Sequence, residues 1–240
     1  MIEKIAHITD LHLDEYFPFK DKITTRKRLD YIINDIKKNN IQHIVCTGDI
    51  GEGDGVSYFF KKIETFNTSV TLGNHDNFFE ISKYYKTGVN FDSKKIYKSQ
   101  EYISFKIIYL DSSSGVIDEK QLIWLKKELK TAKPIIIFIH HPIIKLDLKV
   151  DEIGKLINRK NLIEILTQVK NEITIYCGHY HIESTSFYKN LKQFITPAVA
   201  FQIKKDLNKI EIDKTISGYR IIQIENTNLT SKINLFDHAD

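Results

Sequence analysis

Five apolar stretches of the 240-residue chain run directly into side chains that can bind a metal ion or transfer a proton. They are Ile5–Thr9 before Asp10-Leu11-His12, Ile44–Thr47 before Gly48-Asp49, Val70–Leu72 before Gly73-Asn74-His75-Asp76, Ile135–Ile139 before His140-His141, and Ile173–Cys177 before Gly178-His179-Tyr180-His181. Short apolar runs are typical of buried strands, and ligands in open α/β sheets bind beyond the carboxyl ends of the strands. We therefore expect the five strand ends to converge on one cleft, with the glycines allowing tight turns and close backbone approach.

The side chains at these strand ends suit two metal ions better than one. A single tetrahedral zinc takes three or four protein ligands, whereas two ions sharing one carboxylate would use every candidate. Mixed nitrogen and oxygen ligands favour Mn²⁺, Fe or Zn²⁺ over Ca²⁺. The seven candidate ligands are Asp10, His12, Asp49, Asn74, His140, His179 and His181.

Each motif alone has an ordinary structural explanation. A Gly-Asp pair after a strand is usually only a turn, and an Asn-His-Asp segment can be a loop with local hydrogen bonds. His7 lies inside the first apolar run and is interpreted as structural, and His141 is a weaker candidate than His140, which leaves its strand first. Five such motifs, each at a strand end of one chain, argue against coincidence.

The segments between the motifs alternate between helix and strand patterns. Helices are expected over residues 26–38, 56–65, 77–86 and 161–169, and a further helix is expected to begin at Asp118, with Gln121 as capping-box partner. From residue 182 onward the pattern is mostly that of strands, at 182–188, 192–195, 219–225 and 231–236. We therefore expect one domain over residues 1–240, with an α/β metal-binding core in 1–181 and a mostly β part in 182–240 that packs on it as a second sheet.

Charge and cysteine content exclude several classes of protein. The 35 Lys and Arg residues against 31 Asp and Glu give a formal net charge of +4, and the lysines are scattered rather than gathered in a basic stripe. A nucleic-acid partner is therefore not expected. Cys46 and Cys177 lie in apolar runs and are expected to be buried thiols, which fits a reducing cytoplasm. The longest purely apolar run, Ile135–Ile139, is far shorter than the roughly 20 residues of a membrane span, and no export segment is visible.

The order of the motifs between residues 10 and 181 resembles that of the calcineurin-like metallophosphoesterases. The resemblance is closer to the bacterial class III cyclic-nucleotide phosphodiesterases, and further segments support it: Leu110-Asp111-Ser112, Gln121–Leu125, Thr196-Pro197 and Gly218-Tyr219-Arg220. It implies a four-layer α/β/β/α sandwich of two mixed sheets with a dimetal site at one sheet edge.

The resemblance also implies a role for each site residue. One ion would be held by Asp10, His12, Asp49 and His181, and the other by Asp49, Asn74, His140 and His179, so that Asp49 bridges. His75 would be the catalytic imidazole facing the phosphate, and Asp76 would orient it.

The expected activity is hydrolysis of a phosphodiester by a hydroxide that bridges the two ions. Two divalent ions, two aspartates and one hydroxide sum to about +1, which balances the single charge of a phosphodiester. We expect 3′,5′-cyclic AMP or GMP as the substrate, converted to the 5′-nucleotide by a monomer or homodimer. The alternatives are a phosphomonoesterase or pyrophosphohydrolase on nucleotide, sugar or lipid-precursor phosphates, a nuclease, and a non-catalytic metal-dependent scaffold. The aromatic residues Tyr16, Phe17, Phe19 and Phe91 could stack on a base or simply cover the edge of the core.

Overall fold

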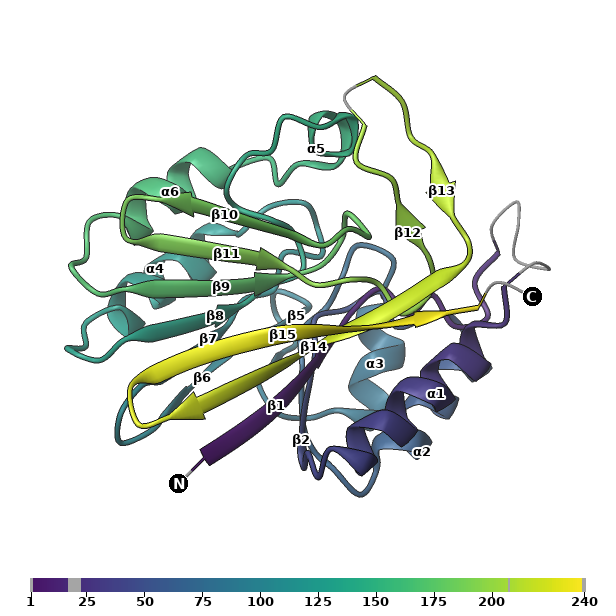
Figure 1. Ribbon diagram of the computed structural model, residues 1–240. Helices are drawn as coiled ribbons and strands as arrows, with labels where there is room; N and C mark the ends of the chain where they lie inside the picture. The colour runs from purple at the N-terminus through teal and green to yellow at the C-terminus, as the bar shows by residue number, and fades with distance from the viewer. Residues whose placement is uncertain (1, 17–22, 207, 239–240) are drawn as a thin grey trace.

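Two mixed β-sheets pack against each other in the computed structural model, which describes residues 2–16, 23–206 and 208–238 (Figure 1). The first sheet has the order β15-β14-β1-β2-β3, with β1–β3 parallel and the two C-terminal strands antiparallel. Its strands are β1 (Ile2–Ile8), β2 (His43–Cys46), β3 (Asn67–Val70), β14 (Ile216–Glu225) and β15 (Asn228–Asp237).

The second sheet has the order β10-β11-β9-β8-β7-β6, and only its two outermost strand pairs are antiparallel. Its strands are β6 (Lys98–Glu101), β7 (Lys106–Tyr109), β8 (Ile135–Phe138), β9 (Ile173–Cys177), β10 (Ser184–Tyr188) and β11 (Leu191–Ile195). Two short hairpins complete the described strands: β4 (Val89–Asn90) with β5 (Lys95–Ile96), and β12 (Gln202–Ile203) with β13 (Ile212–Asp213).

Helices cover the outer face of each sheet, so the expected α/β/β/α sandwich is confirmed. The first sheet packs on α1 (Thr25–Lys38), α2 (Asp54–Ile63) and α3 (Phe78–Tyr84), and the second on α4 (Glu119–Glu128), α5 (Lys149–Gly154) and α6 (Arg159–Leu166). Buried residues of β1 show why the layers form. Ala6 and Ile8 belong to the helix-facing core and Ile5 to the core between the sheets, because successive strand residues point to opposite faces.

The strands of residues 182–240 divide between the two sheets. β10 and β11 extend the second sheet beside β9, whereas β14 pairs with β1 and places Ile222 opposite Ile5. The expectation that residues 182–240 form the second sheet is therefore wrong. Alternation of apolar residues identifies a strand but does not specify its neighbour, because any strand edge offers the same backbone groups.

The expected helix at Asp118 is present, but its capping box is only half formed. The Asp118 side chain accepts a hydrogen bond from the backbone N–H of Gln121 at 2.8 Å. The Gln121 side chain turns instead to Asp111, donating to its carbonyl and accepting from its backbone N–H, both at 2.8 Å. Gln121 thus anchors the loop after β7 to α4.

Both cysteines are buried free thiols, as predicted. Among the helices of the described residues, none combines the length and apolar character that crossing a membrane requires.

Candidate metal centre

The side chains after β1, β2, β3, β8 and β9 lie together, although the first three strands belong to one sheet and the last two to the other. The predicted convergence of strand ends therefore occurs where the carboxyl ends of the two sheets meet. Among the described residues, ligand atoms within reach of one another form three groups. Two contain only predicted ligands, and the third joins His12 to Glu15 and His75.

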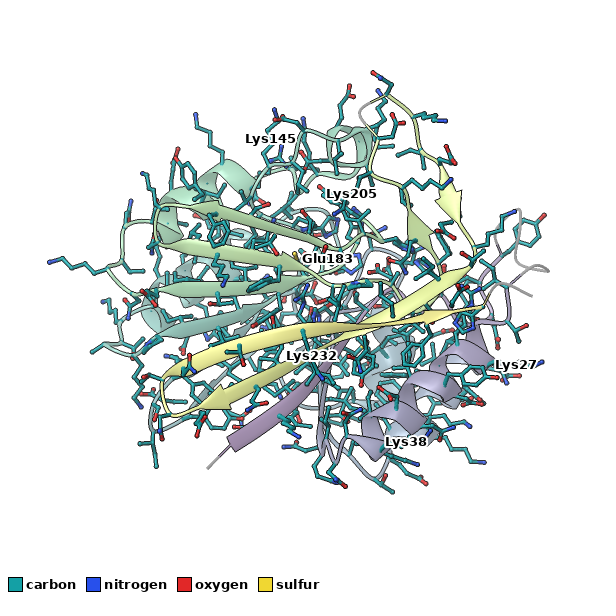
Figure 2. All side chains as sticks on the ribbon, viewed as in Figure 1. Lys27, Lys38, Lys145, Glu183, Lys205 and Lys232 are labelled. Atoms are coloured by element: carbon teal, nitrogen blue, oxygen red, sulfur yellow. The ribbon has the colours of Figure 1, made fainter. Side chains whose placement is uncertain are left out.

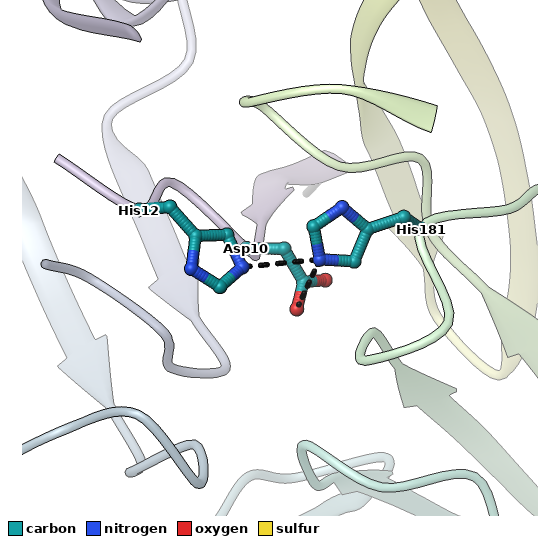
Figure 3. A group of neighbouring side chains, drawn as sticks. All are labelled: Asp10, His12 and His181. Carbon is teal, nitrogen blue, oxygen red and sulfur yellow. Dashed lines mark hydrogen bonds and ion pairs between the residues drawn. The ribbon is translucent and has the colours of Figure 1, made fainter. Parts of the chain in front are cut away.

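The first group consists of Asp10, His12 and His181, which point toward one another (Figure 3). The Nε2 atoms of His12 and His181 are 3.1 Å apart, and His181 Nε2 lies 3.6 Å from Asp10 Oδ1. All three residues are buried.

The second group gathers around Nε2 of His140. This atom lies 3.1 Å from Nδ1 of His179, 3.1 Å from Oδ1 of Asn74 and 3.3 Å from Oδ2 of Asp49. The same Asp49 oxygen is 3.8 Å from His12 Nε2 in the first group. Oδ2 of Asp49 thus lies close to the Nε2 atoms of His140 and His12, one in each group, as a bridging ligand requires.

Each of the four candidate ligand histidines has one ring nitrogen facing the other ligands. The second ring nitrogen donates a hydrogen bond away from them. His140 Nδ1 donates to the carbonyl oxygen of Thr47 at 2.9 Å, His179 Nε2 to that of Gly154 at 2.7 Å and His181 Nδ1 to that of Phe201 at 3.0 Å. His12 Nδ1 lies 2.8 Å from Glu15 Oε2. Such contacts orient metal-binding histidines in proteins.

When all four rings are neutral, these hydrogen bonds leave ring nitrogens with lone pairs facing each other in both groups. Two lone pairs about 3 Å apart repel unless a cation lies between them, and buried charges are ordinarily paired or coordinate a metal. The mixed imidazole, carboxylate and amide donors therefore fit two first-row metal ions. These residues could hold one ion in each group, with Asp49 shared.

Burial and neighbouring charges set the protonation states of the site. Burial disfavours the ionised form of Asp49, but the imidazoles of His140 and His12 outweigh it and hold the pKa of Asp49 well below its usual value. Burial lowers the pKa of His181 well below its usual value and that of His179 to about 3. At His12 and His140 the neighbouring carboxylates outweigh burial and raise the pKa to about 9. The ionised Asp49 and the neutral His179 and His181 are in the forms that bind metals, and His12 and His140 would each release a proton to a bound cation.

Five of the seven candidate ligands have a backbone in the left-handed region. Their φ angles are 54° at Asp10, 45° at His12, 52° at Asp49, 70° at His179 and 51° at His181. Such a conformation costs a non-glycine residue on the order of 1 kcal/mol and is concentrated at functional sites. The turns after β1, β2 and β9 therefore direct the ligands into the cleft at the expense of stability.

Glycine is required where the loop after β9 approaches β1. A Cβ atom on Gly178 would lie 2.1 Å from Thr9 Oγ1 and 2.5 Å from Asp10 Oδ2, which no side chain tolerates. The predicted need for close backbone approach is confirmed at this position.

The structure corrects the expected partner of His75. The Asp76 carboxylate accepts hydrogen bonds from the backbone N–H groups of Asp49, Ile50 and Gly73, each at 2.8 Å. The carboxylate oxygen beside His75 Nδ1, at 3.1 Å, belongs to Glu15, which also raises the pKa of His75. The expectation that Asp76 orients His75 is therefore wrong. These three hydrogen bonds hold the loops after β2 and β3 together. They also satisfy the Asp76 carboxylate, which needs several donors away from water.

Glu15 is the residue of the site that sequence reasoning missed. Its side chain is buried and follows His12 by three residues. The three-residue spacing from His12 could have indicated a carboxylate partner for that ring. It does not distinguish Glu15 from Asp14, which is just as close in sequence but pairs with Arg26 at the surface.

The remaining candidates occupy supporting or peripheral positions. His141 accepts or donates a 2.9 Å hydrogen bond with Ser112 Oγ, and its ring packs on that of His179 with centroids 4.1 Å apart. Tyr16 and Phe91 are exposed, and residues Phe17 and Phe19 lie outside the described residues.

The lysines labelled in Figure 2 project from well-separated elements, among them α1 and β15.

Comparison with known proteins points to one family. The sequence profile of the calcineurin-like phosphoesterases matches residues 3–183. A probable cyclic nucleotide phosphodiesterase of Fibrobacter succinogenes is 26% identical over 231 residues, covering 92% of this chain and 89% of its own. The 3′,5′-cyclic adenosine monophosphate phosphodiesterase CpdA of Haemophilus influenzae is 24% identical, with 92% and 85% covered. A probable glycerophosphodiester phosphodiesterase GpdQ of Arcobacter nitrofigilis is 27% identical, with 69% and 66% covered.

Solved structures share the fold at low sequence identity. A dimetal phosphatase from Danio rerio superposes with a TM-score of 0.67 at 11% identity, with 96% of this chain and 98% of the other covered. GAP50, the anchor in the inner membrane complex of Plasmodium, superposes with a TM-score of 0.68 at 14% identity, with 97% and 84% covered.

Proposed function

Since the chain belongs to the calcineurin-like phosphoesterases and is therefore a metal-dependent phosphoesterase, we propose that it hydrolyses phosphodiester bonds of small nucleotides, with 3′,5′-cyclic AMP or GMP as substrate. The observation that carries the proposal is the position of Asp49 Oδ2, 3.3 Å from His140 Nε2 and 3.8 Å from His12 Nε2. One carboxylate shared by two donor groups fits the two-ion site that is typical of the family. The relatives named as cyclic nucleotide phosphodiesterases support this substrate class.

The proposed ligand sets correspond to the two groups. One ion would be held by Asp10, His12, Asp49 and His181, and the other by Asp49, Asn74, His140 and His179. When bound, such ions stabilise charge on the phosphoryl oxygens and lower the pKa of a water nucleophile; we expect manganese, iron or zinc.

The proposed proton donor is His75. Glu15 occupies its Nδ1, which leaves Nε2 to face substrate, and the ring is about half exposed, with 52% of the side chain accessible. A sugar alkoxide is a poor leaving group, so a proton delivered to that oxygen as the bond to phosphorus breaks speeds its departure. Asp76 would act indirectly, because its three backbone hydrogen bonds hold the loops that carry Asp49 and His75.

A glycerophosphodiester is the second candidate substrate. The relatives named as glycerophosphodiester phosphodiesterases favour it, and it has the same single charge and alkoxide leaving group. Phosphomonoesters and pyrophosphates carry more negative charge than the about +1 of the occupied site balances.

The test is incubation of the purified protein with 3′,5′-cyclic AMP, with and without added Mn²⁺, followed by chromatography. Mn²⁺-dependent release of 5′-AMP is expected, and an Asp49→Asn variant serves as the metal-site control. Glycerophosphoethanolamine and p-nitrophenyl phosphate are assayed in parallel. Exclusive turnover of the glycerophosphodiester would move the assignment to the second candidate, and turnover of the monoester alone would overturn the diesterase proposal.

A further inference from the structure

The Glu15 carboxylate lies between two imidazoles of the cleft. Its Oε2 atom is 2.8 Å from Nδ1 of His12 and 3.1 Å from Nδ1 of His75. The two rings stand nearly perpendicular, at 88°, with centroids 5.0 Å apart. Glu15 is 6% exposed, so a fixed, buried anion borders both a candidate metal ligand and the candidate proton donor.

We propose that Glu15 is the positioning residue for His75 and fixes which nitrogen of that ring faces the substrate. An ionised carboxylate only accepts hydrogen bonds, so the nitrogen beside it must be Nδ1–H. The orientation of the ring then leaves Nε2 as the atom that meets the leaving group. A carboxylate in this position also stabilises the charged ring that general-acid catalysis requires.

His75 needs such a support because of where it lies. It follows Asn74 in the loop between β3 and α3, and about half of its side chain is exposed to solvent. An exposed side chain is free to exchange rotamers, so holding one ring in place costs conformational entropy. The contact with a buried carboxylate offsets that cost before substrate arrives.

The second oxygen of Glu15 points to a role other than stability. Oε1 is buried and has no hydrogen-bond partner within the described part of the chain. A buried carboxylate oxygen without a donor destabilises a fold. A residue retained only for packing would not need an ionised group here, whereas a residue that must present a full negative charge to His75 does.

The inference rests on the proposed function for its chemical step. A water oxygen bonds to phosphorus while the bond from phosphorus to the leaving sugar oxygen breaks with its electron pair. That oxygen takes the proton from His75 Nε2, the water loses its own proton to solvent, and the neutral ring is reprotonated from solvent. Glu15 remains ionised and keeps the hydrogen bond from Nδ1–H throughout.

The first test reads the tautomer of His75 directly. Long-range ¹H–¹⁵N NMR on the zinc-loaded protein at alkaline pH distinguishes Nδ1–H from Nε2–H, and a His75→Ala spectrum assigns the signal. We expect Nδ1–H in the wild type and a shift toward Nε2–H in Glu15→Gln. A tautomer that is unchanged by Glu15→Gln would overturn the inference.

The second test uses the leaving group. Without protonation an alkoxide leaves slowly, whereas p-nitrophenolate needs no proton. Glu15→Gln should therefore lower kcat/KM about 100-fold for the alkyl diester that the wild type hydrolyses, but less than about threefold for bis(p-nitrophenyl) phosphate. In a His75→Ala background, Glu15→Gln should leave this selectivity unchanged, since Glu15 acts through His75. Glu101→Gln, which removes a carboxylate from a surface ion pair with Lys133, is the matched control.

Metal analysis separates the two contacts of Glu15. Equal losses for both substrates, together with lost metal, would mean that Glu15 only supports His12 and would overturn the assignment to His75. A wild type that hydrolyses no phosphodiester would instead refute the proposed function, and the tautomer measurement would then decide the role of Glu15 alone.

Discussion

The Nε2 atoms of His12 and His181 lie 3.1 Å apart, although 169 residues separate them in the sequence. His12 follows a strand of the first sheet and His181 a strand of the second. The first group of ligands therefore exists only when both sheets have packed, and metal binding should stabilise the packed state. Single substitutions in this cleft can separate metal binding, proton transfer and loop packing from one another.

Asp49→Ala should lose both metal ions, because Asp49 Oδ2 is within 3.8 Å of His12 Nε2 and 3.3 Å of His140 Nε2. Metal content after dialysis, measured by inductively coupled plasma mass spectrometry, checks this. Asn74→Ala, which removes a contact with His140 alone, should keep the ion of the first group. Near-normal stoichiometry in Asp49→Ala would contradict a shared carboxylate.

His75→Ala should retain both ions and lose about 10²–10⁴-fold in turnover of an alkyl diester, since general-acid catalysis contributes that much. The backbone N–H of His75 donates to Asp49 Oδ1 at 2.8 Å, and this bond survives the substitution. Steady-state kinetics and metal analysis on the same preparation are the measurements. Loss of metal along with activity would make His75 a structural residue.

Gly178→Ala should displace Asp10, because the new Cβ would lie 2.5 Å from Asp10 Oδ2 and 2.1 Å from Thr9 Oγ1. Overpacking of this kind costs about 1–3 kcal/mol of unfolding free energy. Urea denaturation and metal affinity should both report the change. Lys120→Ala, at an exposed position of α4, is the control. Equal behaviour of the two variants would show that the loop after β9 moves aside freely.

His7 should make the protein less stable in mild acid. Its Nδ1 and Nε2 bond the hydroxyls of Thr196 and Thr47 at 2.7 and 2.9 Å. Burial, reinforced by Arg220, holds the pKa of His7 well below its ordinary 6.5. Below pH 6.5 the unfolded chain therefore binds a proton that the folded chain does not, and stability falls as pH falls.

Urea unfolding of wild type and His7→Gln, with chelator present, isolates this contribution. The free energy of unfolding of the wild type should decline relative to that of the variant by up to about 1.4 kcal/mol per pH unit. If the unfolding free energies of wild type and His7→Gln changed in parallel from about pH 7.5 to about pH 5.5, His7 would take up its proton equally in the folded and unfolded chains.

The architecture around the ligands was largely predictable from sequence. Buried strands leave apolar runs, and the predicted strand over residues 173–177 coincides with β9. The segment after each run is short and chemically distinctive, so the convergence of these strand ends could be expected before the fold was known. The grouping of Asp10, His12 and His181 was expected only from the resemblance to the calcineurin-like metallophosphoesterases.

The contacts of individual side chains were harder to predict from the sequence. Asp76 and Glu15 are both acidic residues near a histidine in sequence, and only the turn geometry decides that Glu15 meets His75 while Asp76 meets backbone N–H groups. The pairing of strands within the sheets was equally hard to predict from the sequence. Nothing in the alternation of residues 216–225 distinguishes pairing with β1 from pairing with β11.

The position of β14 between β15 and β1 has a consequence for biosynthesis. A ribosome synthesises all seven candidate ligands, through His181, before it makes the strand whose Ile221 pairs with Ala6. A nascent chain at that stage would carry the complete ligand set while one edge of β1 still lacks its neighbour. Synthesis of the ligands and completion of the sheet around β1 are thus separated in time, and interrupting translation between β11 and β14 would yield chains that carry every candidate ligand but lack the strand that borders β1 opposite β2.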